Sequence, residues 1–392
     1  MSGGRDVIVV GAGPVGFLVA LGLARAGAEV TVLDCESGIN SSPRAAIYFP
    51  TTLALLDKLG LLEDALAIGL KSTLFTRRYL ETGESIAADL RDILPPGERY
   101  DYNLHFGQHI LADLVMRHLE RLPNARVLWD HKVVSLDQDA AGVTLGVETP
   151  EGVRSMTSDW VVGADGARSA VRHLLGLSFD GFTWPERFVA TNVEYDFGEL
   201  GFAPANMIMD PLDWGVCARL GRENLWRVTF GEDAGLDEAT VGERIPARYE
   251  VLFPGIGAYR IDRFSPYRVH ERCASAFRAG RVLLAGDAAH ACNPCGGFGL
   301  TSGVIDADVL AEALGAVIGG RAGEDLLDFY AAERRRVFLE VTSPMAREMK
   351  RLLSEADPAR RAADKAMITG RTETARGSPT MSRGILGQPL PV

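Results

Sequence analysis

The sequence is poor in the features that mark several classes of protein. Its 392 residues include only five cysteines, an odd and sparse number that argues against a disulfide framework. No apolar segment approaches the roughly 20 residues of a transmembrane helix, and no basic leader precedes an apolar stretch with a cleavage site. Basic residues are the minority, with 41 Lys and Arg against 52 Asp and Glu. The resulting charge of −11 disfavours nucleic acid as a partner, and together these absences predict a cytoplasmic protein without a membrane span.

What is present is the composition of a globular chain. Hydrophobic residues make up 47% of the sequence and charged residues 24%, which excludes wholesale disorder. The length predicts two or three domains.

The N-terminus carries a strand, a glycine-rich turn, a helix and a second strand. A β-branched run at 6–10 leads into Gly11-Ala-Gly13-Pro-Val-Gly16, and the second strand ends at Asp34. Gly11 allows a tight turn, Gly13 lets a pyrophosphate approach the backbone, and Gly16 permits close packing of helix on strand. Asp34 lies where a carboxylate would accept hydrogen bonds from a ribose. The unit predicts dinucleotide binding but does not separate FAD from NAD.

A second motif, Asp165-Gly166-Ala-Arg168, follows the apolar run at 161–164. By itself this motif indicates a strand, a turn and a helix whose arginines, Arg168 and Arg172, are solvated.

A third motif begins where the apolar run at 281–285 ends in Gly286-Asp287. Gly286 lets a ligand come close, and Asp287 would offer its carboxylate to a polyol such as the ribityl chain of a flavin. Gly297 and Gly299 free the backbone to lie against a flat ring. The helix that follows, capped by Thr301 or Ser302, would direct its positive end at that ring.

These three motifs, in this order, resemble those of the single-component FAD-dependent aromatic hydroxylases related to p-hydroxybenzoate hydroxylase (class A flavoprotein monooxygenases). The resemblance covers nearly the whole chain to about residue 350. It implies that the first motif binds the ADP part of FAD, that the Asp-Gly motif serves FAD and NAD(P)H, and that the Gly-Asp motif holds the ribityl chain. Arg44 would meet the FAD phosphates and Gln108 would lie near the ribityl chain. Leu300 and Thr301, where many members have Leu-Asn, would lie at the pyrimidine edge of the flavin.

The resemblance also implies an α/β fold. We expect a Rossmann-like FAD-binding domain of the glutathione-reductase type, with an inserted, mainly antiparallel β-sheet substrate domain and a helical C-terminal region. The expected parts are FAD-binding segments at 1–75, 104–178 and 269–320, an excursion toward the substrate domain at 76–103, the substrate sheet at 179–268, and C-terminal helices with a loose tail at 321–392.

The implied activity is hydroxylation of a phenolic or heteroaromatic small molecule with O2 and NADH or NADPH, through a C4a-hydroperoxyflavin. The single dinucleotide fingerprint favours transient use of NAD(P)H at the flavin. Pro294 is the expected catalytic residue, because the family places the carbonyl of this proline at the substrate ring. A flavin-dependent dehydrogenase or halogenase, and a non-enzymatic flavin-binding protein, stay open as alternatives. The expected assembly is a monomer or a homodimer.

Candidate substrate contacts are Tyr48, Arg219 and Trp226. Tryptophans on such strands more often belong to the core, while Arg219 and Arg227 would either pair with a substrate anion or be solvated. No metal site is expected: Cys292 and Cys295 have half-site spacing, but no second pair completes a zinc site. His290 belongs to the same loop and is expected to order its backbone.

Overall fold

The computed structural model describes residues 5–374 and 384–391. One half of the molecule is built on a six-stranded sheet with the order β18-β19-β12-β1-β2-β8, whose strands come from distant parts of the chain. Only β18 is antiparallel to its neighbour. These strands are β1 (Asp6–Val10), β2 (Glu29–Leu33), β8 (Ala125–Leu128), β12 (Trp160–Gly163), β18 (Arg278–Ala279) and β19 (Val282–Leu284).

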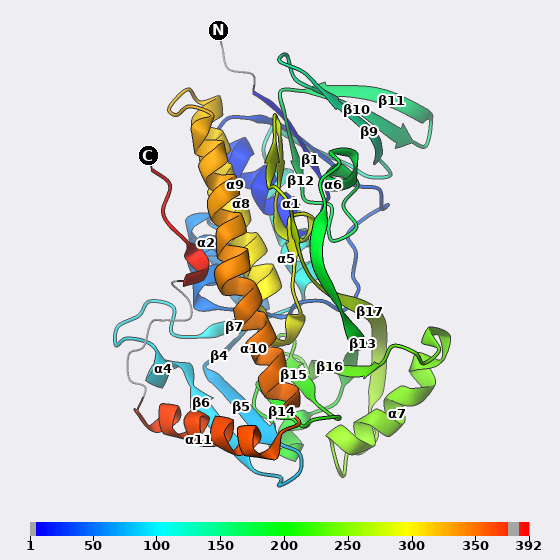
Figure 1. Ribbon diagram of the computed structural model, residues 1–392, viewed down its shortest axis with the longest axis vertical. Helices are drawn as coiled ribbons and strands as arrows, with labels where there is room; N and C mark the ends of the chain where they lie inside the picture. Colours follow the sequence, from blue (N-terminus) through cyan, green and yellow to red (C-terminus); the bar gives the residue numbers. More distant parts are fainter. Residues whose placement is uncertain (1–4, 375–383, 392) are drawn as a thin grey trace.

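This sheet is buried on both faces, which explains the uninterrupted apolar runs of its strands. Val7 and Val9 of β1 belong to a core shared with three helices, α1 (Pro14–Arg25), α5 (Gln108–Leu119) and α8 (Phe298–Ile318). Ile8 and Val10 instead pack toward an antiparallel three-stranded sheet, which covers the opposite face (Figure 1). Its strands are β9 (Lys132–Gln138), β10 (Val143–Thr149) and β11 (Gly152–Ser158).

The other half of the molecule contains an eight-stranded sheet with the order β20-β17-β13-β16-β15-β14-β5-β6 (Figure 1). All of its pairs are antiparallel except β14 with β5. The strands are β5 (Leu74–Tyr79), β6 (Ser85–Asp89), β13 (Phe179–Glu194), β14 (Ala205–Met209), β15 (Gly215–Arg219), β16 (Leu225–Asp233), β17 (Arg260–Ala274) and β20 (His290–Ala291). The expected excursion therefore supplies β5 and β6, and β17 continues beyond the expected boundary at residue 268.

One face of the eight-stranded sheet is covered by a helix that the sequence did not suggest. Helix α7 (Val241–Leu252) packs Ile245, Tyr249 and Leu252 against the sheet, although Pro246 lies inside it. Proline within a helical pattern usually argues against a helix. Burial of the apolar stripe outweighs the hydrogen bond that Pro246 removes.

Smaller elements join the two halves. A three-stranded antiparallel sheet has the order β3-β7-β4. The small elements are β3 (Ile47–Tyr48), α2 (Pro50–Lys58), α3 (Leu62–Ile68), β4 (Leu70–Ser72), α4 (Leu90–Ile93), β7 (Asn103–His105) and α6 (Ala170–Leu174).

The C-terminal region is helical, as expected, but the described part of the expected loose tail is packed on the molecule. Helix α9 (Asp325–Val337), a π-helical turn (Phe338–Thr342) and α10 (Ser343–Ser354) form a column along the molecule, and α11 (Pro358–Thr374) follows (Figure 1). Ile385, in the expected tail, is 2% exposed and packs with Phe298 and Ile305 of α8. The rest of that tail, residues 375–383 and 392, lies outside the described residues. No described helix is long and apolar enough to cross a bilayer.

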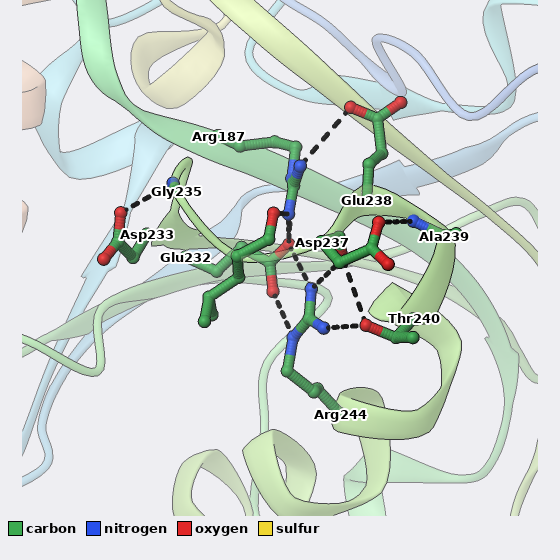
Figure 2. A network of polar contacts seen from close by, with 10 residues as sticks. Arg187, Glu232, Asp233, Gly235, Asp237, Glu238, Ala239, Thr240 and Arg244 are labelled. Carbon is green, nitrogen blue, oxygen red and sulfur yellow. Dashed lines mark hydrogen bonds and ion pairs between the residues drawn. The ribbon is translucent and has the colours of Figure 1, made fainter.

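A buried ion-pair network links strands β13 and β16 of the eight-stranded sheet to helix α7. Figure 2 shows the guanidinium groups of Arg187 and Arg244 on either side of the Glu232 carboxylate, at 2.6 and 3.0 Å. The Glu232 side chain is only 6% exposed. Burial alone would raise the pKa of Glu232, but the hydrogen bonds from Arg244 and Arg187 outweigh it and lower the pKa.

We expect Glu232→Gln to lower the free energy of unfolding by about 3 kcal/mol, because it leaves the buried Arg187 with only the exposed Glu238 as an anionic partner. The folded-state pKa of Glu232 is depressed, so the stabilisation is present above its ordinary value of 4.5 and is lost as the pH falls through the folded value. The difference between wild type and variant in urea unfolding should therefore shrink in acid. Glu238→Gln is the matched control, because Glu238 contacts the same arginine at 3.4 Å but is 62% exposed, and it should cost less than about 1 kcal/mol.

Candidate active site

The three glycines of the N-terminal turn have different structural roles. Gly11 has φ +108°, and a Cβ there would lie 2.4 Å from the Ala164 carbonyl oxygen; a Cβ at Gly16 would lie 1.9 Å from the Gly11 carbonyl oxygen. A Cβ at Gly13 would meet nothing within 4 Å. Gly13 is also the N-cap of α1, with no side chain bonded to the first helical N–H groups. The open side of Gly13 and these N–H groups form a cradle for a phosphate anion.

Asp34 is fixed beside this cradle by two backbone donors. Its Oδ2 accepts from the Ala12 N–H at 2.6 Å, and its Oδ1 accepts from the Glu36 N–H at 2.8 Å. Each carboxylate oxygen keeps a further lone pair. The side chain is half-buried at the end of β2, so it can accept hydrogen bonds from a ribose hydroxyl lying over the turn.

Gln108 ties the segment that carries Arg44 to the first turn of α5. The Gln108 N–H donates to the Ala45 carbonyl at 3.1 Å, and the Ala45 N–H donates to Gln108 Oε1 at 3.3 Å. Arg44 is exposed, with its guanidinium 5.2 Å from the centre of the Tyr267 ring. Burial raises the pKa of Asp287, and the charge of Arg44, after that of His290, partly opposes this rise. Arg44 and Asp287, 243 positions apart in the sequence, therefore border one space.

Asp287 forms part of the wall of that space. Gly286, Ala288 and Ala289 are buried, while Asp287 itself is exposed. Loss of surrounding water nevertheless raises the pKa of Asp287, which is the expected effect for a carboxyl inside a cleft. Gly286 has φ +59°, and its missing side chain leaves room for Val15 of α1.

The Asp-Gly motif lies next to the Gly-Asp motif, and Arg172 joins them. Asp165 Oδ2 accepts from the Val171 N–H at 3.1 Å, while its Oδ1 is buried with no hydrogen-bond partner in the described chain. Gly166 has φ +76° and Arg168 is exposed. Arg172 is not solvated, contrary to expectation: it is 2% exposed and donates to the carbonyls of Ala288 and Ala167, both at 2.8 Å. Local sequence gave no signal for this contact, because Ala288 is remote in the chain.

Helix α8 begins earlier than expected and is not capped by a hydroxyl. It starts at Phe298 with Gly297 as its N-cap, at φ +70°. Thr301 Oγ donates to the Gly297 carbonyl at 3.0 Å, inside the first turn, so the expected capping by Thr301 or Ser302 is wrong. Around Gly299, a Cβ would meet only Cys292 Sγ at 3.8 Å. The free N–H groups of this turn, with Leu300 half-buried among them, could bind the polar edge of a flat ring.

Pro294 is exposed at the start of a 3-10 turn (Pro294–Gly296) that precedes α8. Its carbonyl accepts from the Gly297 N–H at 3.0 Å, which leaves one lone pair for another donor. Cys295 is buried behind the turn and Cys292 is half-buried, and burial raises the pKa of both thiols. Among the described residues, no group of His, Cys, Asp and Glu could hold a metal ion.

On the eight-stranded sheet, Arg227 and its neighbour Trp226 lie on opposite faces. The antiparallel register places Arg227 beside Asn192 and Ala218, on the face opposite to α7. Arg227 is 5% exposed; its Nε donates to Asn192 Oδ1 at 2.8 Å, and one of its terminal nitrogens, Nη1, is buried without a partner in the described part of the chain. Burial lowers the pKa of Arg227 to about 10.

The other two expected substrate residues on these strands lie elsewhere. Trp226 is buried in the core under α7, edge-on to Phe197 at 5.2 Å. Arg219 donates to the carbonyls of Arg222 and Glu223 and to Asn224 Oδ1, so it closes the turn between β15 and β16. The period of two along β16 would have placed Arg227 and Trp226 on opposite faces, but not shown which face belongs to the core.

Tyr48, the third candidate substrate contact, lies close enough to Arg227 for the charge of the arginine to act on its phenol. It is 1% exposed and stacks on Phe106 at 4.2 Å, and its hydroxyl has no partner among the described residues. Burial raises the pKa of Tyr48, and the charge of Arg227 partly opposes that shift. Burial likewise raises the pKa of Tyr267, which is opposed first by Arg44 and then by Arg227. Two phenols and two guanidinium groups therefore meet between the Gly-Asp motif and the sheet.

This donor set fits FAD. The open cradle at Gly13 suits a pyrophosphate, Asp34 a ribose, Asp287 a polyol, and the first turn of α8 a ring edge, while the orphaned Asp165 oxygen is a further acceptor beside the Gly-Asp turn. A fold with one dinucleotide cradle and a separate, mainly antiparallel sheet is compatible with a flavin-dependent monooxygenase.

The comparisons with known proteins agree with that class. Residues 5–343 match the model of the family described as FAD binding domain, and the chain belongs to this family. It is an FAD-dependent aromatic monooxygenase with NAD(P)H as co-substrate, so the resemblance and the fold class inferred from the sequence are confirmed, and the alternative of a non-enzymatic flavin-binding protein is set aside.

Particular relatives are similar along nearly their whole length. The chain is 48% identical over 365 residues to para-nitrophenol 4-monooxygenase of Pseudomonas sp. (strain WBC-3), covering 92% of this chain and 90% of that one. It is 43% identical over 361 residues to 6-hydroxy-3-succinoylpyridine 3-monooxygenase of Pseudomonas putida (strain DSM 28022 / S16), covering 91% of each. The crystal structure of p-nitrophenol 4-monooxygenase from Pseudomonas putida DLL-E4 matches with a TM-score of 0.93 at 45% identity, covering 99% of this chain and 100% of that one.

Proposed function

We propose that this protein oxidises a small phenol or hydroxypyridine at the ring carbon para to the hydroxyl, where the ring carries a second substituent that departs. The observation that carries the proposal is Arg227, a buried cation with an unpartnered nitrogen between two buried phenols. A buried, unpaired charge is costly, and an anionic ligand such as a phenolate offsets that cost.

The names of the two relatives support the position of attack. In para-nitrophenol the oxidised carbon, position 4, is para to the hydroxyl and carries the nitro group. In 6-hydroxy-3-succinoylpyridine the oxidised carbon, position 3, is para to the 6-hydroxyl and carries the succinoyl group. The two rings differ, but the geometry is the same, and it is this geometry that we propose for the present enzyme.

Arg227 would act by favouring the ionised phenol. A guanidinium lowers the pKa of a nearby phenol and so raises the electron density at the para carbon. The hydroxyl of Tyr48 has no partner and would donate to the same oxygen or to the opposite substituent. Ala190 and Ala218 lie on the same face of the sheet as Arg227. We propose that their small side chains make room for an aromatic ring.

The cofactor would be held by the motifs described above. FAD, once reduced by NAD(P)H, supplies the electrons that activate O2. We propose that Arg44 and the Gly13 cradle hold its phosphates, that the Pro294 turn borders the substrate ring, and that Arg168, exposed at the Asp-Gly motif, meets NAD(P)H. The full set of residues proposed for FAD is Gly11, Gly13, Gly16, Asp34, Arg44, Gln108, Asp165, Gly166, Arg168, Gly286, Asp287, Gly297, Gly299, Leu300 and Thr301.

4-Nitrophenol is the probe for this proposal. One nitrophenolate, one O2, one NAD(P)H and one proton should give one 1,4-benzoquinone, one nitrite, one NAD(P)+ and one water. We expect NADH or NADPH oxidation to accelerate when 4-nitrophenol is added, with nitrite formed in proportion. 3-Nitrophenol is the control, because its para carbon carries no leaving group, and it should release no nitrite. Oxygen insertion with retention of the nitro group, or no acceleration by any para-substituted phenol or hydroxypyridine, would reject the proposed position of attack.

We also propose a cytoplasmic enzyme that works as a monomer or a homodimer. The location is supported by the cysteines, all of which are free thiols in the described structure.

A further inference from the structure

The segment at 384–391 is docked on helix α9 by polar contacts to its backbone. Arg334 Nη1 donates to the carbonyls of Ile385 at 2.9 Å and Leu386 at 3.2 Å. The N–H of Gln388 donates to Glu333 Oε1 at 2.7 Å. Because Ile385 is also buried, this short segment is held at both its backbone and its side chains.

The same arginine reaches a buried carboxylate on helix α8. Arg334 Nε donates to Asp306 Oδ1 at 2.7 Å, and Arg334 Nη2 donates to Ser302 Oγ at 3.3 Å. Arg334 is 1% exposed and Asp306 is fully buried. Burial alone would raise the pKa of Asp306, but the charges of His290 and Arg334 outweigh it and lower the pKa to about 2. The pair is therefore a fixed ionic contact between α9 and α8.

Asp306 in turn holds the Gly-Asp turn from behind. Its other oxygen, Oδ2, accepts from the Gly286 N–H at 3.1 Å and lies 2.6 Å from His290 Nε2. His290 is clamped between the rings of Phe338 and Phe277, with centroids at 4.5 and 5.8 Å. Both ends of the turn that carries Asp287 are thus bound to one carboxylate.

We propose that the C-terminal segment 384–391 is an integral part of the FAD site and sets the affinity for FAD through Arg334 and Asp306, which act as positioning residues. If the carbonyls of Ile385 and Leu386 are removed, Nη1 of the buried Arg334 loses both of its hydrogen-bond acceptors. The guanidinium must then reorient toward other acceptors or bind a water molecule. Asp306 then loses its fixed partner, and the Gly286 turn loses the anchor that aims Asp287 into the cleft.

The test compares FAD binding in four variants: Arg334→Met, a chain ending at residue 383, the two changes combined, and Arg351→Met. Arg351 is the control, because it is an ion-paired arginine on α10 whose partners, Glu348, Glu355 and Asp364, all lie outside the Gly-Asp turn. Apo-protein is titrated with FAD by flavin fluorescence, below the melting temperature of the least stable variant, with circular dichroism to confirm folding.

We expect Arg334→Met and the truncation each to raise the dissociation constant of FAD by about tenfold, the loss expected when a hydrogen bond to a charged group is removed. The combined variant should be no worse than either change alone, because both break one chain of contacts. Arg351→Met should change the constant by less than about twofold. Unchanged FAD affinity in the truncated protein, or fully additive losses in the combined variant, would overturn the proposal.

Should Arg334→Met not fold, Arg334→Lys takes its place. Lysine keeps the positive charge but reaches fewer of the four acceptors, so a several-fold rise in the FAD dissociation constant is expected, and no rise counts against the proposal. The titration contains no phenol and no NAD(P)H. Its outcome is therefore independent of the substrate proposed above.

Discussion

Alanine at Gly16 should prevent stable folding, whereas alanine at Gly13 should leave the fold intact and weaken FAD binding. A Cβ at Gly16 would lie 1.9 Å from the carbonyl oxygen of Gly11, a backbone atom that cannot move without opening the turn between β1 and α1. We expect the free energy of unfolding to fall by at least about 3 kcal/mol, because a clash with backbone atoms cannot be relieved by a small side-chain movement.

At Gly13 the same methyl group would point into open space, and φ is −78°, which alanine adopts freely. Apo-protein carrying Gly13→Ala should therefore melt within a few degrees of wild type. Its dissociation constant for FAD should rise by at least about tenfold, because the methyl group holds the pyrophosphate away from the N–H groups of α1. Thermal unfolding of the apo-proteins and FAD titration separate the two effects. Normal FAD affinity in Gly13→Ala would mean that the phosphates lie elsewhere.

Replacing Arg227 with methionine should raise the KM for the phenol by about a hundredfold and leave FAD binding unchanged. The expected loss is about 2–3 kcal/mol, that of a charged hydrogen bond in a buried site. Steady-state kinetics across pH add a second readout. If Arg227 favours the phenolate, the variant should need a higher pH to reach half of its maximal kcat/KM.

The stability of the unliganded protein distinguishes a binding role from a structural one. Arg227 is buried with one unpartnered nitrogen, so methionine of similar length should leave the melting temperature unchanged or raise it. Arg219→Met is the matched control, because Arg219 lies on the neighbouring strand and closes a turn; it should lower stability slightly and leave KM unaltered. A destabilised Arg227→Met with normal KM would assign Arg227 to the core.

Predictions from sequence motifs agreed with the structure where the contacts involved lie within one short segment of the chain. The turn at Gly11, Gly13 and Gly16 depends on backbone angles and contacts within one strand–helix crossover, so spacing alone indicates it. Expectations that needed a partner from another part of the chain were less reliable. Arg172 was expected to be solvated, yet it is buried against Ala288, and the expected loose tail contains the buried Ile385.

By itself, the sequence determined the dinucleotide cradle, the order of the three motifs and the presence of a mixed fold with an inserted sheet. It could not determine which side chains of a strand face the core and which lie on the opposite face. Trp226 and Arg227 are adjacent and point to opposite faces, and only pairing with Asn192 and cover by α7 decide which face is core. The same reason applies to Asp306, Arg334 and Ile385. Their contacts join segments that are distant along the chain. These segments meet only when the interior of the protein packs, and no local sequence pattern predicts that packing.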